Sequence, residues 1–193
     1  MTPISTDQEI ACQQVLLDDN SVFSVQWSVF PSQIASSLTA GKLMLRYLDY
    51  IHSCTLTVIR PLQREDGIEF RLLGSRLSLI SFLPPVFEKD DLVIRICGGF
   101  LVQPRQCHRG ELRFTVAPDR EGVRVSLQLS DFCPLLLGSP TPSRTRFWLY
   151  RLTQAAIHKL VTLRFLTLLY RELYGSSARV RVVAARVREG QPV

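Results

Sequence analysis

The feature that most constrains this chain is a long helical pattern from Ser143 to Tyr174 that carries apolar residues on almost every side. Ser143 can cap the first helical turn, and Gly175 stands where a helix would stop. Helical spacing predicts one apolar stripe, made of Leu149, Leu152, Ala156, Leu160, Leu163, Tyr170 and Tyr174. We expect the centre of this stripe, Leu152, Ala156 and Leu160, to pack against the sheet.

A second stripe of the same helix begins polar and becomes apolar. Its polar half consists of Arg151, Gln154, His158 and Thr162. The next positions at the same spacing are Phe165 and Leu169, so the second half of the helix has no polar face of its own. Because a large exposed apolar surface usually marks a contact, we expect another element to cover this half.

Residues 178–188 are our candidate for that cover, because arginine and valine alternate there. As a strand, this segment would bury Val180 and Val182 and leave Arg179 and Arg181 in water. A loose basic tail is the alternative, since chain ends are often poorly ordered.

The part of the chain before the long helix predicts a sheet. Ser21 to Phe30 alternates, with Phe23, Val25, Trp27 and Val29 expected on the buried face. Two short helices are expected next, over Gln33 to Leu38 and Lys42 to Ile51. Short segments rich in β-branched and aromatic residues then follow, separated by turn signals: Cys54 to Arg60, Ile68 to Leu73, Arg76 to Phe82, Asp91 to Cys97, Gly110 to Val116 and Val123 to Leu129. Gly98 and Gly99 indicate a bulge or bend.

These elements predict an α+β fold in which a curved antiparallel sheet of about six to seven strands wraps around a long C-terminal helix. With 193 residues, of which 46% are hydrophobic, the chain is long enough for one domain with its own core. We divide residues 1–193 into a polar lead-in (1–20) that could hold a short strand near Cys12 to Leu17, a body (21–174) and an Arg/Val-rich tail (175–193).

Charge and cysteine content set further bounds. The net charge of +6 comes from arginine and permits contact with phosphate, anionic lipid or an acidic protein. We do not expect nucleic acid as a partner. The start of the chain lacks an export signal, and no apolar run reaches the ~20 residues of a membrane span. Five scattered cysteines favour reduced thiols and a cytoplasmic protein: Cys12, Cys54, Cys97, Cys107 and Cys133.

The order of elements resembles the helix-grip fold of the START-like (SRPBCC) superfamily, which includes lipid-transfer domains, hydrophobic-ligand carriers and polyketide cyclases. The resemblance covers roughly residues 21–174. It rests on the Phe30-Pro31-Ser32 step from the first strand into a helix, and on the strands from Gly99 to Leu129 followed by the long helix. The chain departs from the family pattern after Gly175, where the alternating Arg/Val segment follows.

The resemblance implies a cavity between the sheet and the C-terminal helix, suited to an apolar ligand. The residues expected to line it are Trp27, Phe70, Phe82, Phe114, Trp148, Leu152 and Ala156. Tyr170 is a further aromatic candidate. The alternative is that these side chains simply fill the core. Polar groups expected at the cavity are Asp131 and His158, although Asp131 could instead form a turn and His158 could be a solvated surface residue.

Residues for other chemistry are sparse in the sequence. The histidines, His52, His108 and His158, have no metal-binding spacing, so neither a metal nor another cofactor is expected. A glycine-flanked nucleophile and a phosphate-binding glycine loop are also missing from the pattern. The leading hypothesis is therefore binding of an apolar small molecule or lipid. The alternative is an interaction protein that uses the apolar helix and basic tail for homodimerisation or for docking on an acidic partner or membrane surface. A cyclase-like enzyme is third.

Overall fold

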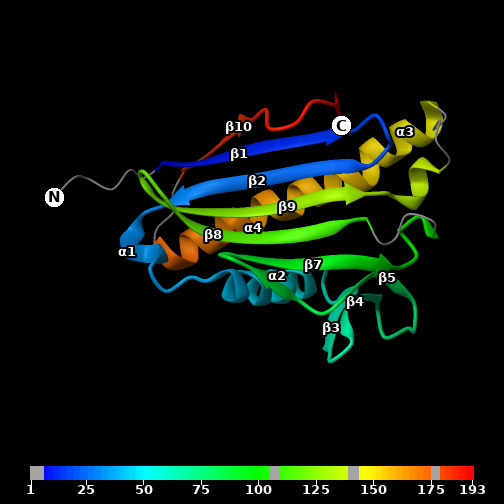
Figure 1. Cartoon of the computed structure of the whole chain (residues 1–193), viewed down its shortest axis with the longest axis horizontal. Helices are drawn as coiled ribbons and strands as arrows, with labels where there is room; N and C mark the ends of the chain where they lie inside the picture. Colours follow the sequence, from blue (N-terminus) through cyan, green and yellow to red (C-terminus); the bar gives the residue numbers. More distant parts are fainter. Residues whose placement is uncertain (1–6, 105–108, 139–143, 175–178) are drawn as a thin grey trace.

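A computed structural model describes residues 7–104, 109–138, 144–174 and 179–193 (Figure 1). The strands are β1 (Asp7–Leu16), β2 (Val22–Phe30), β3 (Ile59–Arg64), β4 (Gly67–Leu72), β5 (Ser78–Phe82), β6 (Val86–Glu88), β7 (Asp91–Gly98), β8 (Glu111–Asp119), β9 (Gly122–Phe132), β10 (Arg179–Ala184) and β11 (Gln191–Pro192). The helices are α1 (Ser32–Ala35), α2 (Ala40–Cys54), the 3-10 turn η2 (Leu135–Leu137), α3 (Arg144–Tyr150), the π-helical turn η3 (Arg151–Ala155) and α4 (Ala156–Tyr174).

The fold class is confirmed, although the sheet is larger than expected. Eleven strands form one sheet in the order β10-β1-β2-β9-β8-β7-β5-β4-β3, with β11 beside β1 and β6 beside β7. The pairs within the described residues are antiparallel, apart from β1 with β10, which is parallel. Helices α2 and α4 cover one face of the sheet, so the long C-terminal helix takes the place that the sequence predicted (Figure 1).

Strand β1 lies in the segment that the sequence analysis described as a polar lead-in. Three of its glutamines are buried, and their amides form hydrogen bonds across the sheet edge and to the helix. Gln8 Nε2 donates to the carbonyl of Leu166 at 3.2 Å, and Gln14 Nε2 donates to the carbonyl of Ala155 at 3.2 Å. Polar composition therefore concealed a ten-residue strand, because its side chains satisfy backbone groups of the helix instead of facing water.

Strand β2 presents the opposite face to the one expected. Its helix-facing side carries Ser24, Gln26 and Ser28, all buried, between Val22 and Phe30. The residues expected in the core form a separate small cluster with Val15 on the other face of the sheet: Phe23, Val25 and, partly buried, Trp27. Hydrophobicity assigned the wrong side because the polar residues of β2 have hydrogen-bond partners beneath the helix, such as Glu9 O for Ser28 Oγ at 2.7 Å.

The C-terminal segment covers this outer cluster. Gln13 of β1 anchors the C-terminal segment. Gln13 Oε1 accepts from the backbone N–H groups of Val187 and Arg188 at 2.7 and 2.9 Å, and Gln13 Nε2 donates to the Arg188 carbonyl at 2.6 Å. The Arg188 guanidinium lies 4.6 Å from the centre of the Phe23 ring. Residues 179–184 form the expected strand, β10, which pairs with β1, and its Val180 is partly buried against the main core, to which Leu166 and Leu169 of α4 belong. Val182 stays half exposed. Ala178, the first residue of the expected cover, lies outside the described residues.

The long helix is continuous from Arg144 to Tyr174, but the π turn η3 interrupts its regular hydrogen bonding. The expected contact face is wrong: Leu152 is 70% exposed, Leu160 is 49% exposed and Ala156 is also exposed. The buried side instead carries Ala155, Thr162, Phe165, Leu166, Leu169 and Tyr170. The physical reason is that polar residues of β1 and β2 and aromatic residues of α2 accept the mixed stripe. This leaves Leu152, Ala156 and Leu160 of the apolar stripe outside, whereas its Tyr170 is buried.

Helix α2 covers the second half of α4. The Phe165 ring lies 5.2 Å from Tyr47 in an edge-on contact and 5.5 Å from Tyr50. Tyr47 in turn makes an edge-on contact with Phe114 of β8 at 5.6 Å. One aromatic group thus joins α4, α2 and the sheet, and it closes one end of the space between them.

Local backbone geometry explains one smaller difference from expectation and one expected feature. The segment Cys54 to Arg60 is not a strand from its start, because α2 continues to Cys54 and positive φ angles at Leu56 and Thr57 reverse the chain before β3. The bend expected at Gly98 and Gly99 is present: the register between β5 and β7 shifts there. Gly99 has φ +119°, and a Cβ at this position would lie 2.5 Å from the Leu79 carbonyl oxygen.

Candidate functional site

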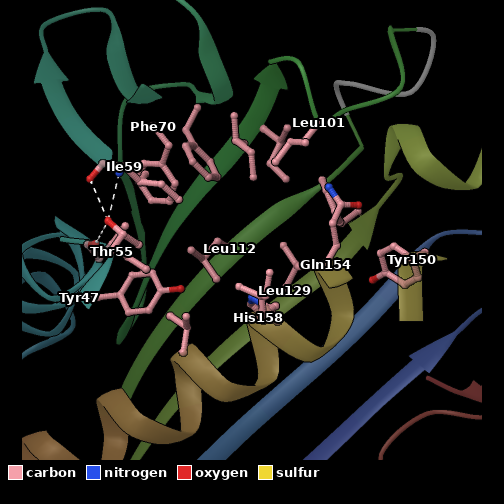
Figure 2. A pocket seen from close by; sticks show the side chains of 17 residues that line it. Tyr47, Thr55, Ile59, Phe70, Leu101, Leu112, Leu129, Tyr150, Gln154 and His158 are labelled. Atoms are coloured by element: carbon pink, nitrogen blue, oxygen red, sulfur yellow. Dashed lines mark hydrogen bonds between the residues drawn. The ribbon is translucent and has the colours of Figure 1, made fainter. Parts of the chain in front are cut away.

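A cavity of about 270 Å³ lies between the sheet, α2 and the start of α4 (Figure 2). Its sheet wall comes from Ile59, Phe70, Ile80, Phe82, Ile96, Leu112, Leu129 and Phe132, with Leu101 from the loop after β7. Its helical wall comes from Tyr47, Ile51 and Thr55 of the α2 segment and from Tyr150, Gln154, Ile157, His158 and Val161. For comparison, a ~150 Å³ apolar cavity is large enough to bind benzene.

The sheet wall is apolar because strand alternation presents one face of each strand to the helices. Leu112 and Leu129 are paired across β8 and β9, so they lie side by side on this face. Phe70 and Phe82 make an edge-on ring contact at 5.3 Å on the neighbouring strands β4 and β5. This wall can bind apolar groups by burial, but it offers them no hydrogen bond.

The polar side chains of the cavity are concentrated on the helical wall. Gln154 lies in the π turn, and His158 follows four residues later on the same helix face. In Figure 2 both side chains extend from the helix toward the sheet wall. Thr55 is already committed, since its hydroxyl accepts from the Ile59 backbone N–H at 3.1 Å.

The π turn positions Gln154. Such a turn changes the backbone hydrogen-bond pattern and is often found at functional sites. Here the Ala155 carbonyl accepts a hydrogen bond from Gln14 of β1, so the sheet fixes the irregular turn from below. Gln154 is thereby held at the edge of the cavity, in a turn whose backbone is tied to strand β1.

The cavity is electrically neutral. None of the described residues that line it is Asp, Glu, Lys or Arg. Burial lowers the pKa of His158 to about 4, so its imidazole is uncharged near pH 7. Burial raises the pKa of Tyr47 and of Tyr150, and both phenols keep their protons. His158 keeps some accessible surface although protein surrounds it, because it faces the cavity instead of a packed neighbour.

Three of the residues expected at the site, Phe70, Phe82 and His158, are among those that line the cavity. Phe114 is fully buried beside it and supports the Tyr47 ring from behind. Tyr170 packs edge-on against Phe30 at 5.2 Å, in the core and outside the lining set. Phe114 and Tyr170 therefore fill the core, as the alternative in the sequence analysis states.

The structure places the other expected residues away from the cavity. Trp27 is on the outer face of the sheet, where the Arg124 guanidinium lies 5.7 Å from its ring centre. Trp148 is 53% exposed, and Leu152 and Ala156 also lie on the outer face of the helix. Leu152 and Ala156 are outside because the mixed stripe of the helix packs against β1, β2 and α2. Asp131 pairs with Arg188 at 3.8 Å, on the side of β9 opposite to Phe132.

Sequence reasoning missed Gln154 and Tyr47 as site residues. Gln154 was assigned to the polar stripe of the helix, and the available signal was that His158 shares this stripe. Tyr47 lies in the predicted second helix, and nothing in its sequence environment indicates the direction of its ring. Leu112 and Leu129 had a clear signal, since both lie on the apolar side of strands with regular alternation.

The chemistry available at this site is binding of an uncharged molecule. Within the described residues, no cluster of three or more His, Cys, Asp or Glu side chains is arranged to hold a metal ion. The titratable side chains that line the cavity are Tyr47, Tyr150 and His158. The described lining residues include no carboxylate and no thiol. The four described cysteines, Cys12, Cys54, Cys97 and Cys133, are free thiols.

Comparison with known proteins gives limited matches. No family model matches this chain, and no curated protein matches it by sequence. Among solved structures, it is similar to the crystal structure of CalU16 from Micromonospora echinospora, with 15% identity and a TM-score of 0.40 over 84% of this chain and 85% of that one. It is also similar to the solution NMR structure of CalU16, with 12% identity and a TM-score of 0.40 over 88% of this chain and 74% of that one.

Proposed function

We propose that this protein binds an apolar small molecule in the cavity between its sheet and its C-terminal helix, as the helix-grip superfamily that its element order resembles would do. The observation that carries the proposal is a cavity of about 270 Å³ whose sheet wall is apolar throughout the described lining. The cavity is partly open to solvent, so an apolar occupant can reach its walls from outside. The apolar surface would bind such an occupant by its removal from water.

A titration with 2-methylnaphthalene, followed by the fluorescence of the ligand, tests this proposal. Wild-type protein should show saturable binding at about one molecule per chain. Leu129→Trp fills the cavity from the sheet side and should weaken binding at least tenfold. Leu62→Trp, at an exposed position of β3, is the matched control and should bind like wild type. Equal binding by both variants, or no saturable binding by the wild type, would refute the proposal.

A second candidate function is supported by the outer face of the long helix. Four large apolar residues on it are 49–70% exposed: Trp148, Leu149, Leu152 and Leu160. Exposed basic residues flank them, namely Arg151, Lys159 and Arg164, and Glu172 is the one acidic residue between positions 144 and 174. No helix among the described residues is long and apolar enough to cross a membrane. An apolar face with basic flanks is typical of helices that lie on anionic membranes.

We propose the surface of an anionic membrane as the partner of this face, because two copies of the helix would bring like charges together. Co-sedimentation with phosphatidylglycerol vesicles should bind the wild type, and phosphatidylcholine vesicles should not. Leu152→Asp should reduce binding, and Leu62→Asp should not change it. Failure to bind phosphatidylglycerol, together with a dimer by light scattering, would overturn the membrane proposal in favour of self-association.

A further inference from the structure

The cavity contains one hydrogen-bond acceptor that the protein leaves unpaired. Gln154 Oε1 is buried and has no partner among the described residues. Buried polar atoms in folded proteins nearly always have a partner. Gln8, Gln14 and Gln26 also have an unpaired Oε1, but of the four glutamines only Gln154 lines the cavity. Gln154 lies in the π turn, a position that the fold maintains through the hydrogen bond from Gln14 to the neighbouring Ala155 carbonyl. The unpaired oxygen is therefore not a mobile surface group, and it has almost no accessible surface, so it can meet a ligand in the cavity only when the Gln154 amide turns.

A second polar group faces the same space. His158 lies four residues after Gln154 on the same helix face, and within the described part of the chain its imidazole makes no hydrogen bond. The backbone carbonyl of His158, in contrast, accepts a hydrogen bond from Thr162 Oγ1 at 3.0 Å. A neutral imidazole offers one N–H donor and one acceptor nitrogen. His158 thus offers a donor and an acceptor to the cavity, and the Gln154 amide, which also has both, lies one turn away on the same wall.

The remaining walls decide what else the ligand must be. Facing these two groups are Phe70, Ile80, Leu112 and Leu129, which can only bury apolar surface. Because no lining residue within the described chain has a formal charge, a carboxylate or ammonium group would lose its hydration without gaining an ion pair. A hydroxyl group fits both polar partners, since it can accept from the His158 N–H and, once the Gln154 amide turns Oε1 toward the cavity, donate to that oxygen.

We infer that the ligand is an uncharged alcohol or phenol with an apolar body, and that Gln154 and His158 bind its hydroxyl while the sheet wall binds its body. This inference rests on the proposed function, of which it specifies the ligand class. The cavity volume of about 270 Å³ sets the size. By comparison with a ~150 Å³ cavity that holds benzene, it accommodates roughly eleven non-hydrogen atoms.

Two probes of this size separate the polar end from the apolar body. 2-Naphthol and 2-methylnaphthalene have the same ring system, and a hydroxyl in the first replaces a methyl group in the second. In a cavity with only apolar walls the methyl compound binds better, because the hydroxyl loses its bonds to water. In the wild-type protein we expect the opposite order, with 2-naphthol bound about 3- to 10-fold more tightly at pH 7, as one or two well-placed hydrogen bonds allow.

The variants assign that preference to the two residues. Gln154→Leu and His158→Leu should each remove the preference for 2-naphthol and leave the affinity for 2-methylnaphthalene unchanged or higher. Gln63→Leu replaces an exposed glutamine of β3 and should leave the preference intact. Far-UV circular dichroism and melting curves check that each variant is folded.

The possible results distinguish failure of the hydroxyl inference from failure of the proposed function. If 2-methylnaphthalene binds to the wild type as well as or better than 2-naphthol, the hydroxyl inference is wrong and the apolar cavity stands. If the preference survives in Gln154→Leu and His158→Leu, other groups bind the hydroxyl and the assignment is wrong. If neither compound binds in a saturable manner, the proposed function itself fails.

Discussion

Acidification should destabilise the native protein through His158, and the size of the effect can be estimated from the structure. Burial lowers the pKa of this imidazole from 6.5 to about 4, while the unfolded chain keeps the ordinary value. Between these pH values the unfolded state binds the proton and the native state does not. The resulting stability is fully present above pH 6.5 and is lost as the pH falls to about 4. Each pH unit in this window is worth ~1.4 kcal/mol, so the loss at pH 4 is about 3 kcal/mol.

Urea unfolding at pH 7 and pH 4 measures this loss. Carboxylates also titrate in the window, so the quantity of interest is the difference between wild type and His158→Gln, which keeps a polar side chain but does not ionise. The wild type should lose about 3 kcal/mol more than the variant on acidification. His52→Gln, which changes an exposed histidine, should lose as much as the wild type. Equal losses in wild type and His158→Gln would show that His158 is hydrated or paired, which would refute the description of the cavity wall.

Three further substitutions test the way the helix is held. Phe165→Ala should cost ~3–5 kcal/mol in urea unfolding, because it empties the buried contact with Tyr47 and Tyr50; a cost below 1 kcal/mol would contradict the contact. Gln14→Leu should cost ~1–3 kcal/mol and speed amide exchange around the π turn, because it leaves the Ala155 carbonyl unpaired; unchanged exchange there would argue against this hydrogen bond. Leu152→Asp should stay within ~0.5 kcal/mol of the wild type, because the side chain is exposed; an unfolded product would restore the contact face predicted from the sequence.

Much of the fold could be predicted from local patterns. The strands that became β2, β4, β5, β7, β8 and β9 have alternation and turn signals, and the long helix has a strong apolar period. The side of each element that faces the core was harder to predict. On β2 the buried face is the more polar one, and the long helix buries its mixed stripe in place of Leu152, Ala156 and Leu160. The reason is that glutamines and serines of β1 and β2 lie beneath the helix and form hydrogen bonds there. Such pairing between distant segments leaves no trace in the periodicity of either segment.

The candidate site was predictable in outline and not in detail. Phe70 and Phe82 could be placed at the cavity because they lie on strands with a clear inner face, and His158 because it shares a stripe with buried positions. Trp148 and Leu152 were misplaced because large apolar side chains were assumed to be buried. Gln154 could not be found, since a π turn depends on contacts that form only when β1 pairs with the rest of the sheet.

The most direct test of the central claim is a crystal structure of the protein soaked with 2-bromonaphthalene, in which anomalous scattering locates the bromine atom. The account predicts one bromine peak per chain inside the cavity bounded by Phe70, Leu129 and His158, and loss of that peak in Leu129→Trp. A bromine peak found only on the outer face of the helix, or a cavity filled by rearranged side chains in the soaked crystal, would contradict it.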